Sequence, residues 1–214
     1  MPNIYDEIYQ KYNITKTSIY IETGCYLGRG ITKPIGCKCS NAFCKCNPVN
    51  TKTLGVLDNY NTIYSIELVK KYYDLNTEQF KNYPNVNIIH GDSTEQLEKL
   101  LKNINEPVTV FLDAHWSGGD TGRLDKDTPL LNELNILKNR KYDDIIIIDD
   151  SRHIGKKGKG GKKGNVNYPP MKFDWTYVTI DKIKSLLKSN YIILSNKNEN
   201  ITDGKKDQLI LISS

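Results

Sequence analysis

The sequence predicts a single α/β domain built on a mostly parallel sheet that closes with an antiparallel pair of strands. Two observations predict this fold. Short apolar runs rich in β-branched residues alternate with longer amphipathic stretches, and the last two apolar runs follow each other with no helix between them. Continuous apolar runs are typical of strands buried on both faces, as in parallel sheets. The 214 residues suffice for one domain with its own core, which we expect to span 1–214.

The elements follow in order along the chain. Inner strands are expected at 18–22, 62–67, 86–90, 108–113 and 144–149. The spacing of apolar residues predicts helices between them at 68–82, 94–103 and 129–139. A further helix is expected at 177–189, followed by strands at 191–195 and 208–213. Those two strands must pair antiparallel, because no helix carries the chain back between them.

A cysteine-rich insertion is expected at about 31–61, where the chain is longer than a strand–helix–strand unit needs. Cys37, Cys39, Cys44 and Cys46 fall within ten residues. Four thiolates can hold a tetrahedral Zn²⁺, which would give a small insertion without a core a reason to fold. Free thiols, or disulfides formed during handling, are the alternative.

A second low-complexity segment at 155–164 contains five lysines, five glycines and no acidic residue. The formal net charge of the chain is +5, so the remainder is neutral. We expect this segment to be a mobile loop that either binds a diphosphate, as in a nucleotide-sugar, or is a solvated linker. Nucleic acid is not expected as the main partner, because a nucleic-acid binder usually spreads its basic residues over a face or helix.

The composition also bears on where the protein acts. No apolar run approaches the roughly 20 residues of a membrane helix, and the first ten residues lack the apolar core of a secretion signal. We therefore expect no membrane association and a cytoplasmic location. The abundance of Lys, Asn and Ile suggests an A/T-rich genome, and a viral protein would act in the host cytoplasm. The sequence allows a homodimer without requiring one.

The predicted inner strands all end in residue types that bind ligands. Ligands of open α/β sheets bind at the carboxyl ends of the strands, so these side chains should converge on one crevice. The alternatives are an ordinary glycine-containing turn after the first strand and carboxylates that only cap helices. The strand ends read, in order, Glu22-Thr23-Gly24 with Gly28, then Glu67, Asp92-Ser93, Asp113-Ala114-His115-Trp116 and Asp149-Asp150-Ser151-Arg152-His153.

The motifs E-T-G-x-x-x-G-x-G, S-I-E-L and G-D-S, in this order, resemble those of class I S-adenosylmethionine-dependent methyltransferases over nearly the whole chain. The resemblance implies a Rossmann-like seven-stranded sheet of order 3-2-1-4-5-7-6. Tyr26 departs from the pattern, because many members have another glycine there, so we expect a differently shaped loop. The residues that the resemblance implies for S-adenosylmethionine are Glu22, Thr23, Gly24, Gly28, Glu67, Asp92, Ser93 and Asp113.

The runs F-L-D-A-H-W-S-G-G and I-I-D-D are most similar to those of the metal-dependent sugar O-methyltransferases of the macrocin type. This resemblance implies that Asp113, Asp149 and Asp150 hold Mg²⁺. A bound Mg²⁺ can lower the pKa of a sugar hydroxyl and orient it. In the competing interpretation, Asp149 is structural and Asp150 caps the following turn.

The acceptor is expected to be a small molecule or a glycan. His115 is the leading candidate for the catalytic base, with Asp113 and His153 as further candidates. His115 can instead form a substrate wall with Trp116. Arg123 and Arg152 are candidates for contacts with the substrate. Two rival functions remain: an RNA or cap methyltransferase, and a non-catalytic interaction protein on the same scaffold.

Overall fold

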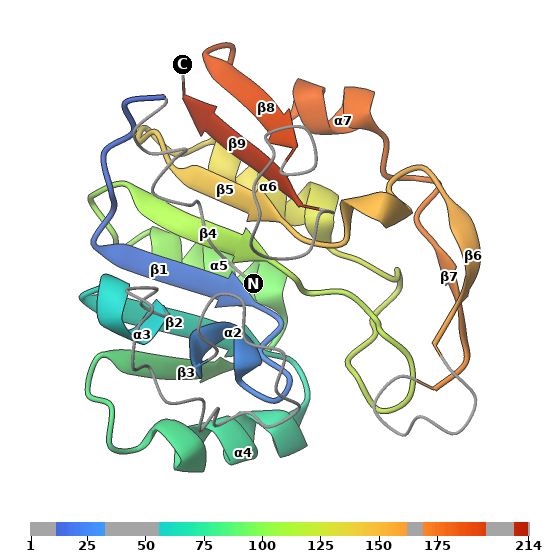
Figure 1. Cartoon of the computed structure of the whole chain (residues 1–214), viewed down its shortest axis with the longest axis horizontal. Helices are drawn as coiled ribbons and strands as arrows, with labels where there is room; N and C mark the ends of the chain where they lie inside the picture. The colour runs from blue at the N-terminus through green and yellow to red at the C-terminus, as the bar shows by residue number, and fades with distance from the viewer. Residues whose placement is uncertain (1–11, 33–55, 162–168, 196–207, 214) are drawn as a thin grey trace, which may run out of the picture.

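The computed structural model describes residues 12–32, 56–161, 169–195 and 208–213. Figure 1 shows a central twisted sheet with helices on both faces. Its seven strands have the order β3-β2-β1-β4-β5-β9-β8, which confirms the predicted order 3-2-1-4-5-7-6. The strands are β1 (Ile19–Thr23), β2 (Thr62–Glu67), β3 (Val86–His90), β4 (Val108–Leu112), β5 (Ile145–Ile148), β8 (Tyr191–Ser195) and β9 (Leu209–Ser213).

Strand direction also follows the prediction. Strands β1 to β5 pair in parallel, whereas β9 pairs antiparallel with both β5 and β8. The carboxyl ends of the parallel strands therefore meet at one edge of the sheet, where the ligand-type side chains were expected. No helix among the described residues is long and apolar enough to cross a membrane.

The helices cover the sheet in two layers. One layer contains α2 (Arg29–Thr32), α3 (Val56–Asn59) and α4 (Lys70–Phe80), and the other contains α5 (Ser93–Leu101), α6 (Leu130–Lys138) and α7 (Ile180–Ser185). Neighbouring strand residues point to opposite layers because side chains alternate along a strand. In β4, Phe111 packs with the first layer, whereas Val110 and Leu112 pack with the second.

A small antiparallel hairpin, absent from the predicted elements, projects beyond β5 (Figure 1). It consists of β6 (Lys157–Gly160) and β7 (Met171–Asp174). The expectation of a mobile loop is therefore wrong for the part of the Lys/Gly segment that forms β6. The glycines leave room for the side chains of the paired strand. A Cβ atom at Gly158 would lie 3.0 Å from the Phe173 side chain, and one at Gly160 would lie 3.1 Å from the Met171 side chain.

Several other expectations differ from the structure in extent. Helix α7 is shorter than the predicted 177–189, and a 3₁₀ turn η1 (Ser151–His153) follows β5. The four clustered cysteines, Cys37, Cys39, Cys44 and Cys46, lie outside the described residues, as does 162–164 of the Lys/Gly segment. The zinc site therefore stays a prediction.

Candidate functional site

A cavity of about 600 Å³ opens at the carboxyl edge of the parallel strands. This volume lies within the roughly 300–1,000 Å³ of most small-molecule sites. Residues from the ends of all five parallel strands line it, as the convergence of the strand ends predicts. The predicted site residues on its wall are Gly24, Glu67, Asp92, Ser93, Asp113, His115, Trp116, Arg123, Asp150 and Arg152.

The turn after β1 presses closely against the end of β4. Gly24 has a φ of +85°, and a Cβ atom there would lie 2.6 Å from the Asp113 carbonyl oxygen. The Gly24 amide also donates to the Ile66 carbonyl at 2.9 Å. A glycine is needed here both for the left-handed backbone and for the close approach.

Tyr26 adopts a backbone conformation in this turn that usually requires glycine, so the predicted difference in loop shape stays a prediction. Its φ is +47°, in a region that non-glycine residues seldom adopt. Its ring packs edge-on against Tyr72 of α4, with centroids 4.6 Å apart. Asn76 holds the backbone in place by donating to the Tyr26 carbonyl at 2.6 Å. Tyr26 and Tyr72 both line the cavity.

Glu67 joins the ends of β1 and β2. Its two carboxylate oxygens accept the backbone N–H groups of Tyr26 at 2.7 Å and Val69 at 2.8 Å. Burial raises the pKa of Glu67, although these backbone hydrogen bonds oppose the rise. Each carboxylate oxygen has two lone pairs, so Glu67 can accept further hydrogen bonds from a ligand in the cavity.

Asp92 and Ser93 follow β3 at the start of α5. The Asp92 side chain caps the helix by accepting the Thr94 N–H at 2.7 Å. The capping role considered from the sequence is therefore present, and Asp92 nevertheless lines the cavity together with Ser93.

Three predicted cofactor residues, Glu22, Thr23 and Gly28, do not line this cavity. Glu22 is buried, accepts the Ser65 hydroxyl at 2.8 Å, and has its pKa raised to about 8 by burial. A Cβ atom at Gly30 would lie 1.8 Å from Glu22 Oε1. The Glu22 carboxylate therefore packs against the backbone of the glycine-containing turn and does not face the cavity.

His115 lies between two carboxylates in the part of the cavity that the ends of β4 and β5 form. Its Nδ1 is 3.2 Å from Asp113 Oδ1, and its Nε2 is 3.0 Å from both Asp150 Oδ2 and the Ser117 hydroxyl. Burial disfavours the charged ring, but the hydrogen bonds and charges of Asp113 and Asp150 outweigh it and raise the pKa of His115 to about 10. The raised pKa favours the protonated ring, which does not suit the predicted role of base.

The carboxylates predicted to hold Mg²⁺ make other contacts. Asp150 has a φ of +53° and forms an ion pair with Arg152 as well as with His115. Buried Asp149 accepts the Gln208 side-chain amide at 3.3 Å. Within the described parts of the chain, no group of three or more His, Cys, Asp or Glu side chains is placed to hold a metal ion. The structure therefore does not assemble the predicted Mg²⁺ site.

Trp116 and Arg123 form one wall of the same part of the cavity. The Arg123 guanidinium lies 4.4 Å from the centre of the Trp116 ring and 2.8 Å from Asp127 Oδ1. Arg123 is half-exposed, so its remaining N–H groups can meet an acceptor that stacks nearby.

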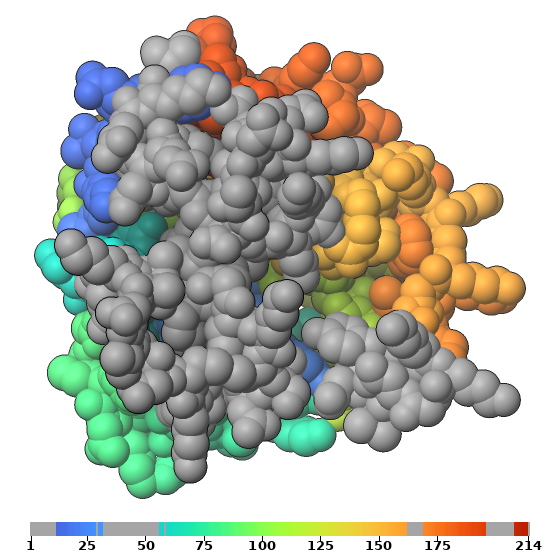
Figure 2. All heavy atoms as spheres, viewed as in Figure 1, coloured from blue at the N-terminus to red at the C-terminus, as the bar shows by residue number. Residues whose placement is uncertain are grey.

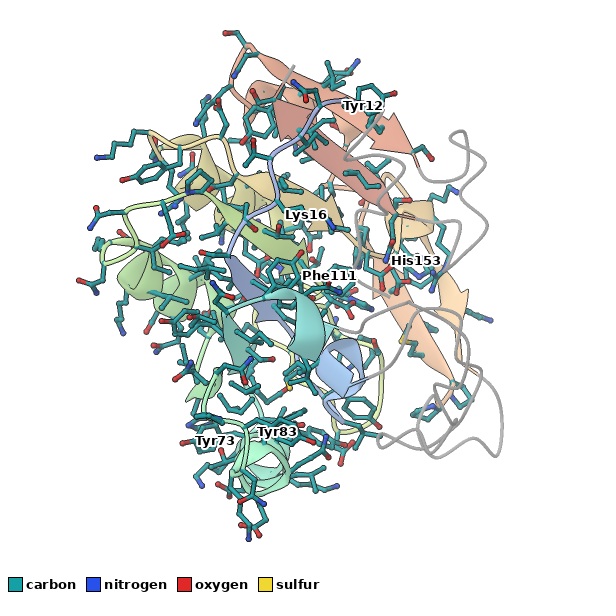
Figure 3. All side chains as sticks on the ribbon, turned by 60° about the vertical axis from the view of Figure 1, so that its left-hand side comes forward. Tyr12, Lys16, Tyr73, Tyr83, Phe111 and His153 are labelled. Atoms are coloured by element: carbon teal, nitrogen blue, oxygen red, sulfur yellow. The ribbon has the colours of Figure 1, made fainter. Side chains whose placement is uncertain are left out.

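His153 lies outside the cavity wall, although it follows β5 as predicted. Figure 3 places it beside the hairpin. Its ring packs 4.2 Å from Phe173 and 5.6 Å from Trp175, and burial, assisted by the charge of Arg152, lowers its pKa. His153 is therefore poorly placed to act as the base in this cavity.

The loop after β4 is fastened across the cavity to α4, a feature that the sequence reasoning missed. Asp120 accepts the Tyr72 hydroxyl at 2.6 Å and pairs with Lys71 at 2.9 Å. Gly122 lies against Leu68, where a Cβ atom would be 2.7 Å away. Nothing in the sequence signals these contacts, because they join residues about fifty positions apart.

No protein-family model matches the sequence, and no curated protein matches it significantly. Solved structures of methyltransferases do share its fold. The chain is similar to a provisionally named rRNA methylase from Clostridium thermocellum, with 11% identity, 99% of this chain and 100% of that chain covered, and a TM-score of 0.53. The sheet order and this similarity together define a Rossmann-like methyltransferase fold.

Two further structures align with lower scores. A provisionally named caffeoyl-CoA O-methyltransferase from Staphylococcus aureus has 15% identity, 98% and 82% coverage of this chain and that chain, and a TM-score of 0.48. A SAM-dependent methyltransferase from Aquifex aeolicus has 10% identity, 97% and 87% coverage and a TM-score of 0.43. At such identities the similarity concerns the fold alone.

Proposed function

We propose that the protein is an S-adenosylmethionine-dependent O-methyltransferase that acts on a sugar hydroxyl. The observation that carries the proposal is the arrangement of Gly24, Glu67 and Asp92 around one cavity. This cavity lies at the carboxyl ends of the strands, where the strand order reverses between β1 and β4. The sugar hydroxyl as acceptor rests on the sequence resemblance.

The residues present fit the cofactor. The missing Cβ of Gly24 lets the backbone approach a ligand closely, and Glu67 has acceptor capacity left for a ribose hydroxyl. Asp92 and Ser93 offer polar atoms to an adenine edge from the start of α5. When bound, S-adenosylmethionine supplies a methyl group on a sulfonium for in-line attack by an acceptor oxygen.

The acceptor hydroxyl must lose its proton as its oxygen attacks. Both ring nitrogens of His115 already face carboxylates, whereas the Asp113 side chain is 28% exposed and lines the cavity. We therefore assign Asp113 as the group that accepts the proton, with His115 and Asp150 holding it in place.

Mg²⁺ does not fit the described arrangement of its predicted ligands. The His115 ring and the Arg152 guanidinium contact the two carboxylate oxygens of Asp150. These two contacts already offset the negative charge of Asp150.

The test is transfer of a radiolabelled methyl group from S-adenosylmethionine to nucleotide-sugars, glycans and RNA, with and without a chelator. Asp113→Asn should lower transfer about 100-fold or more, the usual range for losing a general base. Asp125→Asn, which changes a carboxylate on the cavity rim, is the matched control. Equal transfer by both variants would contradict the role of Asp113.

A further inference from the structure

The hairpin β6–β7 has two different faces. Directly opposite residues of an antiparallel pair share a face, so the pairs Lys157–Asp174 and Lys159–Lys172 lie together on one side. All four of these residues are exposed. We call this side, with its three lysines, the lysine face. The other side carries Gly158, Phe173, Gly160 and Met171, which are partly buried.

The glycine side of the hairpin packs against residues that lie beside the cavity. Phe173 lies against His153, and a Cβ atom at Gly118 would be 3.1 Å from Met171. The Asp174 amide donates to Asp127 Oδ2 at 2.7 Å, and the other oxygen of Asp127 pairs with Arg123. The hairpin is therefore attached, through Asp127, to the cavity wall that contains Arg123.

The lysine face consequently points away from the cavity. Figure 2 shows the hairpin as a gold and orange projection at the right edge of the molecule. A small diphosphate held inside the cavity would not meet side chains on the opposite side of the hairpin. An extended polyanion could place one unit in the cavity and lay the rest along the lysine face.

The charges on this face are unbalanced. Lys159 and Lys172 lie directly opposite each other, which is a repulsive arrangement. Asp174 is the one acid on the face, and its Oδ1 already accepts the backbone N–H and the hydroxyl of Thr176. An added phosphate would relieve this repulsion. Lys156, also exposed, continues the positive charge towards Arg152 at the cavity rim.

We propose that the acceptor is an RNA strand whose phosphates lie on the lysine face while one ribose enters the cavity. The inference rests on the proposed O-methyl transfer and names its substrate. A ribose 2′-hydroxyl is a sugar hydroxyl, as the sequence resemblance implies, and it exists in RNA but not in DNA.

The transfer would then join the methyl carbon to the 2′-oxygen. The carbon–sulfur bond breaks, its electron pair stays on sulfur, and the 2′-hydroxyl proton passes to the Asp113 carboxylate. The products are a 2′-O-methylated strand and neutral S-adenosylhomocysteine, so atoms and charge balance.

The experiment measures fluorescence anisotropy of a short labelled single-stranded RNA at several salt concentrations. The test variant is K157Q/K159Q/K172Q. The control variant K81Q/K99Q/K102Q removes the same charge from exposed lysines of α4, α5 and their ends. We expect the test variant alone to bind at least tenfold more weakly, with a salt slope lower by about 2, since each phosphate contact contributes about 0.7.

Parallel titrations with a nucleoside diphosphate sugar and with phosphatidylserine vesicles distinguish other sources of phosphate. The proposal is overturned if the wild type binds no RNA at low salt, or if both variants lose RNA affinity equally. It is also overturned if the lysine face binds either alternative ligand more tightly than RNA. Transfer of labelled methyl groups to RNA, and not to DNA of the same sequence, would support it.

Binding of S-adenosylhomocysteine, measured by calorimetry on the same three proteins, keeps the two proposals apart. Equal affinity in all three shows that the variants are folded and that the cofactor site is intact. If the wild type does not bind S-adenosylhomocysteine, the proposed function is contradicted, whatever the RNA result.

Discussion

His115 and Asp150 join the carboxyl ends of β4 and β5, with 3.0 Å between His115 Nε2 and Asp150 Oδ2. The same ring meets Asp113 on its other side. A charged imidazole thus offsets two carboxylates in a site where their mutual repulsion would otherwise be costly.

This arrangement predicts a loss of stability at alkaline pH. The pKa of His115 is raised from 6.5 to about 10, so its contribution is fully present below pH 6.5 and is lost as the pH rises towards 10. The free energy of unfolding in urea should fall by an added amount of up to about 5 kcal/mol across this range. The His115→Gln variant should lack that loss.

His153 should show the opposite dependence of stability on pH. Because its pKa is lowered, its unfavourable charging should reduce stability as the pH falls through 6.5, and His153→Gln should remove that reduction. Identical pH profiles for the two variants would contradict both assignments.

Glu133 of α6 is a buried carboxyl whose Oε1 has no hydrogen-bond partner among the described residues. Burial raises its pKa from 4.5 to about 7, although the Ser93 and Thr23 hydroxyls oppose the rise. The buried carboxyl favours its protonated form over the ionised one. The free energy of unfolding of the protein should therefore fall as the pH rises from 4.5 through about 7. Glu133→Gln should therefore stabilise the protein by up to about 3 kcal/mol at pH 8 and hardly at all at pH 4.

Urea denaturation at the two pH values measures this effect. The exposed Glu95 of α5 is the control, because Glu95→Gln removes a carboxylate from the surface. A gain at pH 8 that equals the gain at pH 4 would show that Glu133 is ionised without penalty.

The contacts of Asp120 should slow the departure of a bound cofactor. Asp120 fastens the loop after β4 to Tyr72 and Lys71 across the cavity. We expect Asp120→Ala to release S-adenosylhomocysteine several-fold faster in stopped-flow experiments, because the loop can then open. Asp74→Ala, which removes an ion pair with Lys70 on the same helix, should leave the rate unchanged. Equal rates for the two variants would mean that the loop does not gate the cavity.

Substitutions at Gly24 and Gly155 should distinguish the cost of steric crowding from the cost of backbone strain. Both have positive φ, at +85° and +73°, but a Cβ atom would meet the Asp113 carbonyl at 2.6 Å only at Gly24. At Gly155 the nearest atom is 3.9 Å away. Gly155→Ala should cost about 1–2 kcal/mol from strain alone, and Gly24→Ala should cost more and weaken cofactor binding. Thermal unfolding and calorimetry check this, and equal costs would refute the close approach.

The sequence predicted the sheet well because its strands are buried on both faces. Ile145–Ile148 shows no alternation, as such strands require, and Asp92 and Asp113 follow strands at the edge where the cavity opens. Strand order followed from the resemblance and from the uninterrupted succession of β8 and β9.

The remaining features depend on contacts that distant residues make. The Lys–Gly composition of β6 predicts a loop, whereas its pairing with β7, which sets Phe173 and Met171 opposite its glycines, makes it a strand. His115 has the sequence context of a base, but Asp113 and Asp150 together raise its pKa, and Asp150 follows a different strand, β5. The sequence predicts that Glu22 binds the cofactor, yet its side chain is buried and accepts a hydrogen bond from the Ser65 hydroxyl.

Calorimetric titration with S-adenosylhomocysteine, with and without Mg²⁺, tests the proposed cofactor site most directly. The wild type should bind with micromolar affinity under both conditions. Glu67→Gln, which replaces the carboxylate expected to hold the ribose, should bind at least tenfold more weakly, whereas the surface change Glu95→Gln should have no effect. Absence of binding by the wild type at millimolar concentration, or equal affinity in Glu67→Gln, would contradict the proposed site.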